Sequence, residues 1–345
     1  MACVPSPAWR VAALLAAAIA ISPVFSFDAL AAAPQVRTQA PGFYRMMLGD
    51  FEVTALLDGT HPFPVQQVLA RQTGQAGGAA QVSLAEASPG EADALLAAAH
   101  LKAPVEGAII AFLINTGARL VLIDSGAGAL YGADGGHLLG NLRAAGYRPE
   151  QVDAVLLTHL HADHVGGVIL NGRMAFPNAT VHVSKRDADY WLSPANRATA
   201  PALLLPMFDG ATGSLKPYVE AGRLQTFDGD VELVPGIRAE ADPGHTPGHS
   251  TYRVQSQGQT LLLWGDTVHV AAVQFPDPGV TLKYDSNGTQ AAQQRMRLLA
   301  DAAQNGYWIG AAHISFPGLG HIGVRGQEFH WIPANYTTNI PDPGR

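Results

Sequence analysis

Cysteine is almost absent from this chain, because the 345 residues contain only Cys3. The sequence therefore excludes an internal disulfide and a thiolate ligand or nucleophile anywhere after that position. Charged residues are also few, at 14%, and the formal net charge is −7. A nucleic-acid surface requires clustered Lys and Arg, and no long basic run is present, so we expect no nucleic-acid partner.

Apolar residues are abundant, at 48% of the chain, which allows a large buried core. A length prior of roughly 150 residues per domain would suggest two domains, but layered α/β folds often exceed that length as one unit. We interpret the chain after its leader as a single domain.

The N-terminus has the pattern of a secretory signal peptide. Arg10 is followed by an apolar stretch at residues 11–21 and by the small-residue run 29–33. We predict a signal peptide over residues 1–33, a hydrolase domain over residues 34–345, and a periplasmic or secreted protein. An uncleaved membrane anchor is the alternative, but the apolar stretch is shorter than the roughly 20 residues that span a bilayer.

Alternation of apolar and polar residues predicts the local elements. Residues 46–59 read as a β-hairpin, residues 61–90 as a loop rich in Pro, Gly and Gln, and residues 91–100 as a short helix. Two segments, 112–126 and 252–266, share one plan: a strand, a glycine turn, an apolar strand and a terminal carboxylate.

Three short apolar runs predict strands that are buried on both faces. They lie at residues 120–123, 155–157 and 261–264. Helices expected at about 137–145, 164–169, 185–192 and 288–304 would cover them. The predicted fold class is therefore α/β, a four-layer αββα sandwich.

Three histidines and an aspartate follow the second apolar run within six residues, as His159, His161, Asp163 and His164. In an extended chain, residues two apart project to the same side, so His159 and His161 can hold one cation. Asp163 and His164 then present a carboxylate and a third imidazole to a second position. A single histidine is more often a packed residue than a ligand, but so dense a polar cluster is costly unless it is paired or ligating.

This run resembles the signature of the metallo-β-lactamase superfamily, and the resemblance covers residues 43–336. It implies that His245, in the run 243–249, completes the first metal site with His159 and His161. It also implies that Asp266 bridges both metals as the catalytic carboxylate, and that His313 completes the second site with Asp163 and His164. Two divalent cations are expected, with zinc first and cobalt, manganese or iron as alternatives.

Other polar residues near these motifs have open roles. His249 is interpreted as a neighbour of the ligands, and His321 as a less suitable candidate than His313 because it lies in a glycine-rich loop. Asp124 either hydrogen-bonds a ligand imidazole and fixes its tautomer or caps a turn.

A finer resemblance, to the methyl parathion hydrolase family, rests on segments outside the metal motif, including 187–193 and 315–322. It implies an aromatic rim around the substrate at Tyr131, Trp191 and Phe208, although ordinary core or surface packing is the alternative for each. The resemblance also suggests a homodimer.

The predicted function is hydrolysis of organophosphate triesters and aryl esters by a hydroxide that bridges the metals. An aryloxide leaves without strong protonation, and the sequence offers no obvious general acid. The alternative is a lactonase that acts on acyl-homoserine or other lactones. A thiolester hydrolase and a metal-binding module without activity are weaker alternatives.

Overall fold

The computed structural model describes residues 1–2, 33–73 and 80–340. Contacts divide the chain into Met1–Gln39 and Ala40–Arg345. The described residues of the first unit contain no helix or strand, and the predicted signal peptide lies almost wholly outside the described residues. Within the described part of the chain, no helix combines the length and apolar character needed to cross a membrane.

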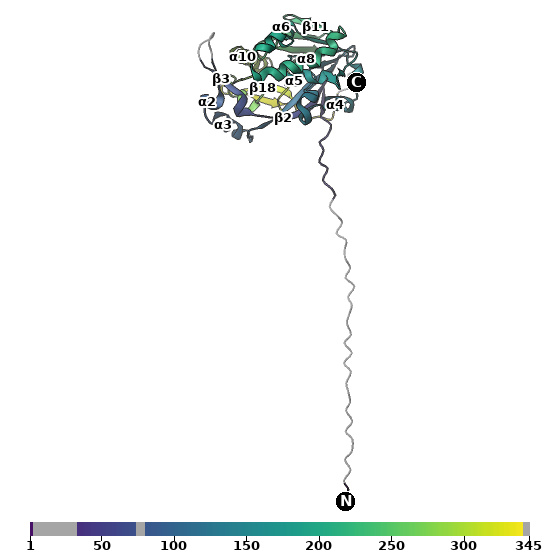
Figure 1. The fold of residues 1–345 in the computed structure, drawn as a ribbon, viewed down its shortest axis with the longest axis vertical. Coiled ribbons are helices and arrows are strands. Elements are labelled where there is room, and N and C mark those ends of the chain that lie inside the picture. Colours follow the sequence, from purple (N-terminus) through teal and green to yellow (C-terminus); the bar gives the residue numbers. More distant parts are fainter. Residues whose placement is uncertain (3–32, 74–79, 341–345) are drawn as a thin grey trace. The chain divides into compact units, whose positions relative to one another are not determined.

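Two seven-stranded sheets form the centre of the Ala40–Arg345 unit (Figure 1). The first has the order β1 (Phe43–Leu48), β2 (Phe51–Phe63), β5 (Val105–Asn115), β6 (Leu120–Ile123), β7 (Ala154–Leu156), β10 (Thr180–Ser184) and β11 (Leu224–Phe227). The second has the order β12 (Val231–Val234), β13 (Ile237–Ala241), β14 (Ser250–Ser256), β15 (Gln259–Leu263), β17 (Trp308–Gly310), β18 (Leu319–Arg325) and β19 (Glu328–Pro333).

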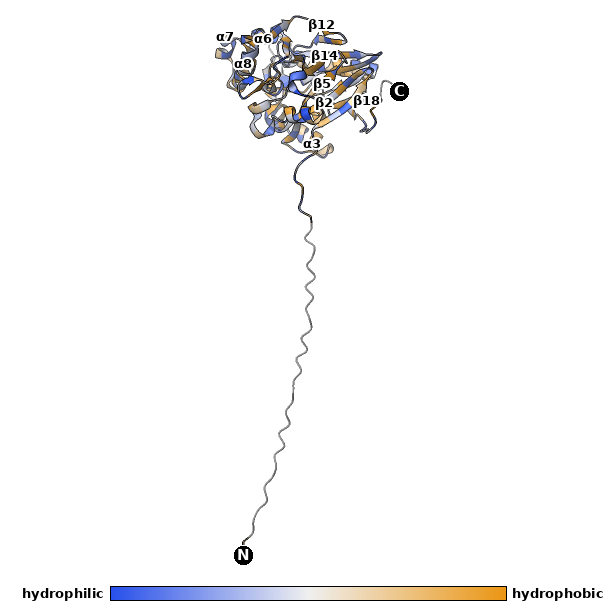
Figure 2. Ribbon diagram, turned by 90° about the vertical axis from the view of Figure 1, so that its right-hand side faces the viewer, coloured by the Kyte–Doolittle hydropathy of each residue, from blue (hydrophilic) through white to orange (hydrophobic). Residues whose placement is uncertain are grey.

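Helices cover the outer face of each sheet, which confirms the four-layer prediction. On β6, Leu120 and Leu122 pack with residues of α4 (Leu138–Ala144) and α8 (Leu205–Glu220). The alternate residues Val121 and Ile123 face the second sheet. The outer face of that sheet packs against α10 (Gly288–Asn305). Figure 2 shows hydrophobic residues along the strands, and each fully buried Leu or Val stabilises the fold by roughly 1.5–3 kcal/mol.

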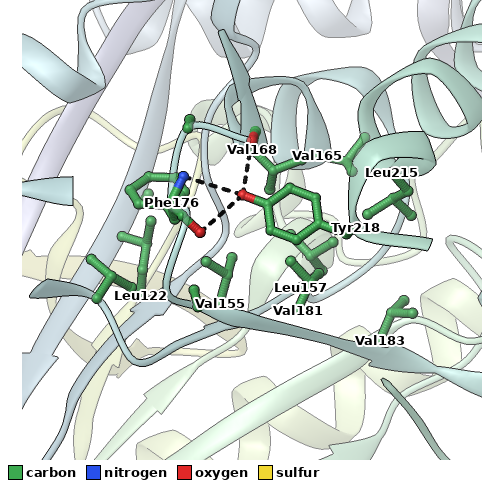
Figure 3. Close-up of a cluster of buried hydrophobic side chains, with 14 of the residues drawn as sticks. Leu122, Val155, Leu157, Val165, Val168, Phe176, Val181, Val183, Leu215 and Tyr218 are labelled. Atoms are coloured by element: carbon green, nitrogen blue, oxygen red, sulfur yellow. Dashed lines mark hydrogen bonds between the residues drawn. The ribbon is translucent and has the colours of Figure 1, made fainter. Parts of the chain in front are cut away.

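Helix α8 also contributes a buried phenol, that of Tyr218, to the core beneath it (Figure 3). The hydroxyl of Tyr218 donates to the carbonyl of Val168 over 3.0 Å and accepts from the amide of Phe176 over 3.2 Å. The surrounding side chains are apolar, and they include Val155, Val181 and Leu215. Tyr218 therefore fixes the loop after the metal motif to the helical layer.

The two segments predicted to share a plan occupy matching places in the two sheets. β5 and β6 form an antiparallel pair, as do β14 and β15. β6 then pairs in parallel with β7, and β15 pairs in parallel with β17. In each segment a carboxylate therefore follows the end of a central strand: Asp124 follows β6, and Asp266 follows β15.

The hairpin prediction is confirmed for β1 and β2, but β2 does not end at Asp58 and Gly59. It continues to Phe63 after a register shift between Leu57 and Gly59. The carboxylate of Asp58 is fully buried and accepts four backbone N–H groups. The donors belong to Ala127, Gly128, Gly136 and Leu138. Asp58 is thus the anchor of a loop and not the end of a strand.

The prediction of an irregular loop over residues 61–90 is wrong. The segment contains α1 (Val65–Val68), β3 (Leu69–Thr73), β4 (Ala80–Ser83) and α2 (Leu84–Ala87) and is followed by α3 (Glu91–Ala98). β3 pairs with β4 and with the distant β16 (Thr281–Leu282). The pairing with β16 joins residues about 210 positions apart, so no local pattern could reveal it.

The helix predictions are confirmed over α3, α4, α6 (Lys185–Trp191) and α10. The expected helix at 164–169 is shorter and earlier, because α5 (Ala162–Val165) passes into a 3-10 turn over Gly166–Val168. Helix α8 was not predicted, since Gly210, Gly213 and Pro217 lower its helix propensity.

Candidate metal centre

All seven predicted ligands lie together at one edge of the two sheets. His159, His161, Asp163 and His164 follow β7, and the last two belong to α5. Asp266 follows β15, His313 follows β17, and His245 lies in the connection between β13 and β14. Because these strands end at the same edge, residues far apart in the sequence become neighbours.

Asp266 lies at the middle of this cluster, and its side chain is 2% exposed. Its Oδ1 lies 2.9 Å from Nε2 of His164 and 3.0 Å from Nε2 of His313. Its Oδ2 lies 3.1 Å from Nε2 of His245 and 3.5 Å from Nε2 of His159. Each carboxylate oxygen therefore faces a different group of imidazoles, which is the arrangement that a bridging carboxylate requires.

The potential ligand atoms fall into the two expected groups. One contains His159, His161, His245 and Asp266, and the other contains Asp163, His164 and His313. Within each group the ligand atoms lie within 4.8 Å of one another. Imidazole and carboxylate donors in sets of three or four suit zinc and related divalent ions.

Several buried atoms of the cluster have no hydrogen-bond partner among the described residues. They include Nε2 of His159, His164 and His313 and Oδ1 of Asp266. A buried polar atom without a partner costs free energy, roughly 1–3 kcal/mol each. Divalent cations would satisfy these atoms, so the residues present fit a two-metal site.

Burial and mutual charge shift the pKa values of the cluster in opposite directions. Burial and the neighbouring His164 lower the pKa of His159 well below its ordinary value. Burial also acts to lower the pKa of His245, but hydrogen bonds to Asp266 and Asp285 raise it to about 9. The pKa of Asp266 falls well below its ordinary value, because the surrounding histidines outweigh the effect of burial. The centre thus keeps an ionised carboxylate among imidazoles, which is the donor set of a metal site.

Carboxylates and a carbonyl outside the cluster orient the imidazoles. Nδ1 of His164 donates to Oδ2 of Asp124 over 2.8 Å, and Nδ1 of His245 donates to Oδ1 of Asp285 over 2.7 Å. Nδ1 of His313 donates to the carbonyl of Ala108 over 2.8 Å. Such partners fix the tautomer and turn Nε2 toward the centre. Of the two roles considered for Asp124, hydrogen bonding to a candidate ligand is the one observed.

Asp187 and His249 connect the two histidine-containing loops. Asp187 is buried and accepts from the amides of Leu160 and Gly248, over 3.0 Å and 2.6 Å, and from the Thr246 hydroxyl over 3.0 Å. His249 is also buried, and its Nε2 accepts the amide of Asp266 over 3.1 Å. His249 therefore supports the backbone of Asp266, in agreement with its interpretation as a neighbour of the ligands.

His321 lies away from the cluster, on β18. Its ring packs on Trp308 with centroids 4.0 Å apart, and its Nδ1 lies 3.2 Å from the carbonyl of Tyr307. The choice of His313 over His321 therefore agrees with the geometry.

One residue of the cluster was missed in the sequence. Nε2 of His269 lies 2.9 Å from Oδ2 of Asp266, and its ring stacks on that of His313. Asp266, His269 and His313 form a third group with ligand spacing. The spacing of three residues between Asp266 and His269 was the only available signal, and by itself it is too common to indicate a site.

The predicted aromatic rim is found only in part. Tyr131 lines a cavity of about 120 Å³ over the centre, together with Phe63, Ile109, Met207 and Tyr284. Trp191 and Phe208 are buried and do not line it. Trp191 packs edge-on against His161 with centroids 5.0 Å apart, and Phe208 packs on Trp191 at 4.6 Å. These two aromatic residues support a candidate ligand from behind, because α6 and α8 cover the outer face of the sheet.

Comparisons with known proteins agree with this geometry. Residues 105–305 match the model of the metallo-beta-lactamase superfamily. The crystal structure of hydrolase AbOPH, in the beta lactamase superfamily, is 35% identical and covers 87% of this chain and 100% of its own, with a TM-score of 0.78. The structure of AidC, a dizinc quorum-quenching lactonase in complex with a product, is 25% identical and covers 86% of this chain and 99% of its own, with a TM-score of 0.73.

An N-acyl homoserine lactonase from Bacillus cereus is 26% identical over 156 residues, which are 45% of this chain and 54% of that protein. The chain thus spans about half the length of this curated relative. These relatives do not test the finer resemblance to methyl parathion hydrolase, which stays a prediction. The family match and the convergence of the motif residues lead to one conclusion. The chain is a metal-dependent hydrolase and belongs to the metallo-β-lactamase superfamily.

Proposed function

We propose that this protein hydrolyses lactones and carboxylic esters at a centre of two divalent metals, most simply zinc. His159, His161, His245 and Asp266 would hold one cation, and Asp163, His164, His313 and Asp266 the other. Cations bound there would supply a hydroxide nucleophile at neutral pH and polarise the oxygen of the bond under attack. Similarity to lactonases supports this choice of substrate.

The observation that carries the proposal is the presence of two tyrosines in the cavity beside the centre. Tyr131 and Tyr284 line the same cavity as Asp163, Asp266 and His313. Burial and the charge of Asp163 raise the pKa of both phenols, so both hydroxyls stay protonated at neutral pH. Protonated hydroxyls can donate hydrogen bonds to an alkoxide as it leaves. A lactone or alkyl ester releases an alkoxide and needs such donors, whereas a nitrophenolate does not.

Organophosphate triesters and aryl esters are the second candidate substrates. Phe63, Ile109 and Met207 give the cavity an apolar wall that suits an aryl group. The nucleophile is the same for both classes, so we expect the activities to overlap. The homodimer, the signal peptide and the periplasmic or secreted location belong to this proposal as well.

The test compares kcat/KM for an N-acyl amino lactone, a nitrophenyl ester and a nitrophenyl phosphotriester. We expect the lactone to be the best substrate. The Tyr131→Phe and Tyr284→Phe variants should lose more activity on the lactone than on either nitrophenyl compound. A strong preference for the phosphotriester, with little turnover of the lactone, would reverse the order of the two candidates.

A further inference from the structure

A histidine and an aspartate form a hydrogen-bonded pair at the edge of the cavity. Nδ1 of His61 lies 2.9 Å from Oδ2 of Asp134, and both side chains are about two-fifths exposed. The His61 ring lines the cavity and packs against the ring of Tyr131, with centroids 5.1 Å apart. We call His61 and Asp134 the mouth pair.

Buried groups hold both members of the mouth pair in place. His61 lies on β2, paired with Gly107 of β5, and the next residue of β5 accepts the hydrogen bond from His313. Asp134 ends the 3-10 segment η1 (Gly128–Asp134), whose two flanks are bound by the buried carboxylate of Asp58. The backbone of Asp134 also contacts β2 so closely at Gly59 that no side chain would fit there. The orientation of His61 is therefore fixed before a substrate arrives.

The mouth pair contributes little to the stability of the fold. An exposed ion pair typically contributes between about 0 and 1 kcal/mol to folding. The pair does, however, determine which nitrogen of His61 carries the proton. A carboxylate can only accept, so in the neutral form of the imidazole Nδ1 carries the proton and Nε2 carries the lone pair. No described residue hydrogen-bonds Nε2 of His61, which leaves it available to a ligand in the cavity.

The size of the cavity brings a substrate into contact with the mouth pair. Sites that enclose a whole drug-sized ligand measure roughly 300–1,000 Å³. The cavity here measures about 120 Å³, so it can hold the reacting ester group and little more. The remainder of a larger substrate must pass over the residues at the edge, which include His61.

From this geometry we infer that His61, oriented by Asp134, determines substrate specificity by accepting a hydrogen bond from an N–H group beside the scissile ester. The preferred class would be lactones or esters that carry an acylamino substituent. This inference rests on the proposed function and extends it from the reaction to the substituent that the site recognises.

The experiment compares two lactones that differ in one group, an N-acyl amino lactone and its analogue with a methylene in place of the N–H. We expect the wild-type protein to prefer the N–H compound by about tenfold in kcat/KM, the value of one hydrogen bond. In His61→Phe, which keeps an aromatic ring against Tyr131, the ratio of the two kcat/KM values should fall to about one. Asp134→Asn keeps an acceptor for Nδ1 and should retain the preference, whereas Asp134→Ala should weaken it.

A purely structural role of His61 would lower both rates equally and leave their ratio unchanged. That result, or a wild-type protein with no preference between the two lactones, would overturn the inference. A wild-type protein that hydrolyses neither lactone would instead overturn the proposed function, so the two failures are distinguishable.

Discussion

Oδ2 of Asp124 accepts hydrogen bonds from both Nδ1 of His164 and the hydroxyl of Thr158, each over 2.8 Å. Oδ1 of the same carboxylate accepts the amide of Thr158, also over 2.8 Å. Asp124 thus joins the end of β6 to the metal motif after β7 and leaves Nε2 of His164 turned toward Asp266.

Replacement of Asp124 should therefore weaken metal binding more than it weakens the fold. We expect Asp124→Ala to lower metal affinity by about 10- to 100-fold, the usual effect of losing a carboxylate partner of a ligand histidine. Competition with a chelating dye would measure this. Asp189→Asn, at an exposed carboxylate that pairs with Lys185, is the matched control and should bind metal normally. Equal metal affinities of the two variants would show that Asp124 does not support metal binding.

Asp266→Asn tests the bridging role. The substitution keeps the shape of the side chain but removes the charge shared by the surrounding imidazoles, so we expect kcat to fall by more than about 100-fold. The fold of the variant should stay largely intact. Normal turnover by this variant would show that Asp266 does not bridge the metals.

Trp191→Ala tests the corrected position of this side chain. Because Trp191 is buried against His161 and Phe208, truncation should destabilise the protein by about 3–5 kcal/mol and also weaken the first metal site. Chemical denaturation and metal analysis would measure the two effects. A variant of normal stability with altered substrate preference would instead show that Trp191 contacts the substrate.

The hydrogen bonds from His245 to Asp266 and Asp285 predict how the metal-free protein responds to pH. The pKa of His245 is raised to about 9, above the value of about 6.5 in an unfolded chain. The stabilisation is complete below the unfolded value and is lost as the pH rises through about 9. The melting temperature of chelator-treated protein should therefore fall between these pH values. Asp285→Asn should make the melting temperature fall less steeply with pH. An unchanged slope would show that the hydrogen bond between His245 and Asp285 does not cause the pH dependence.

The site was predicted in two ways, from the short-range spacing of one motif and from the family resemblance. His159, His161, Asp163 and His164 follow one strand within six residues, so their convergence needs no tertiary information. The roles of His245, Asp266 and His313 were predicted from the resemblance to the metallo-β-lactamase superfamily, whereas Asp124 was noted because it ends an apolar strand. The central strands were found from their short apolar runs, since they are buried on both faces.

The parts that were missed depend on long-range pairing. β3 pairs with β4 and also with the distant β16, and no local pattern indicates the second pairing. His269 reaches Asp266 through a short turn that has no periodic sequence pattern. Trp191 was placed at the substrate because aromatic residues suit both a rim and a core. Only its burial behind His161 distinguishes the two positions.

The most direct test of the central claim is metal analysis of the purified protein, with a lactone assay before and after chelation. We expect two divalent ions per chain, loss of hydrolysis when they are removed, and its return when zinc, cobalt or manganese is added. A metal-free protein that hydrolyses the lactone at the full rate would show that hydrolysis does not depend on the metals.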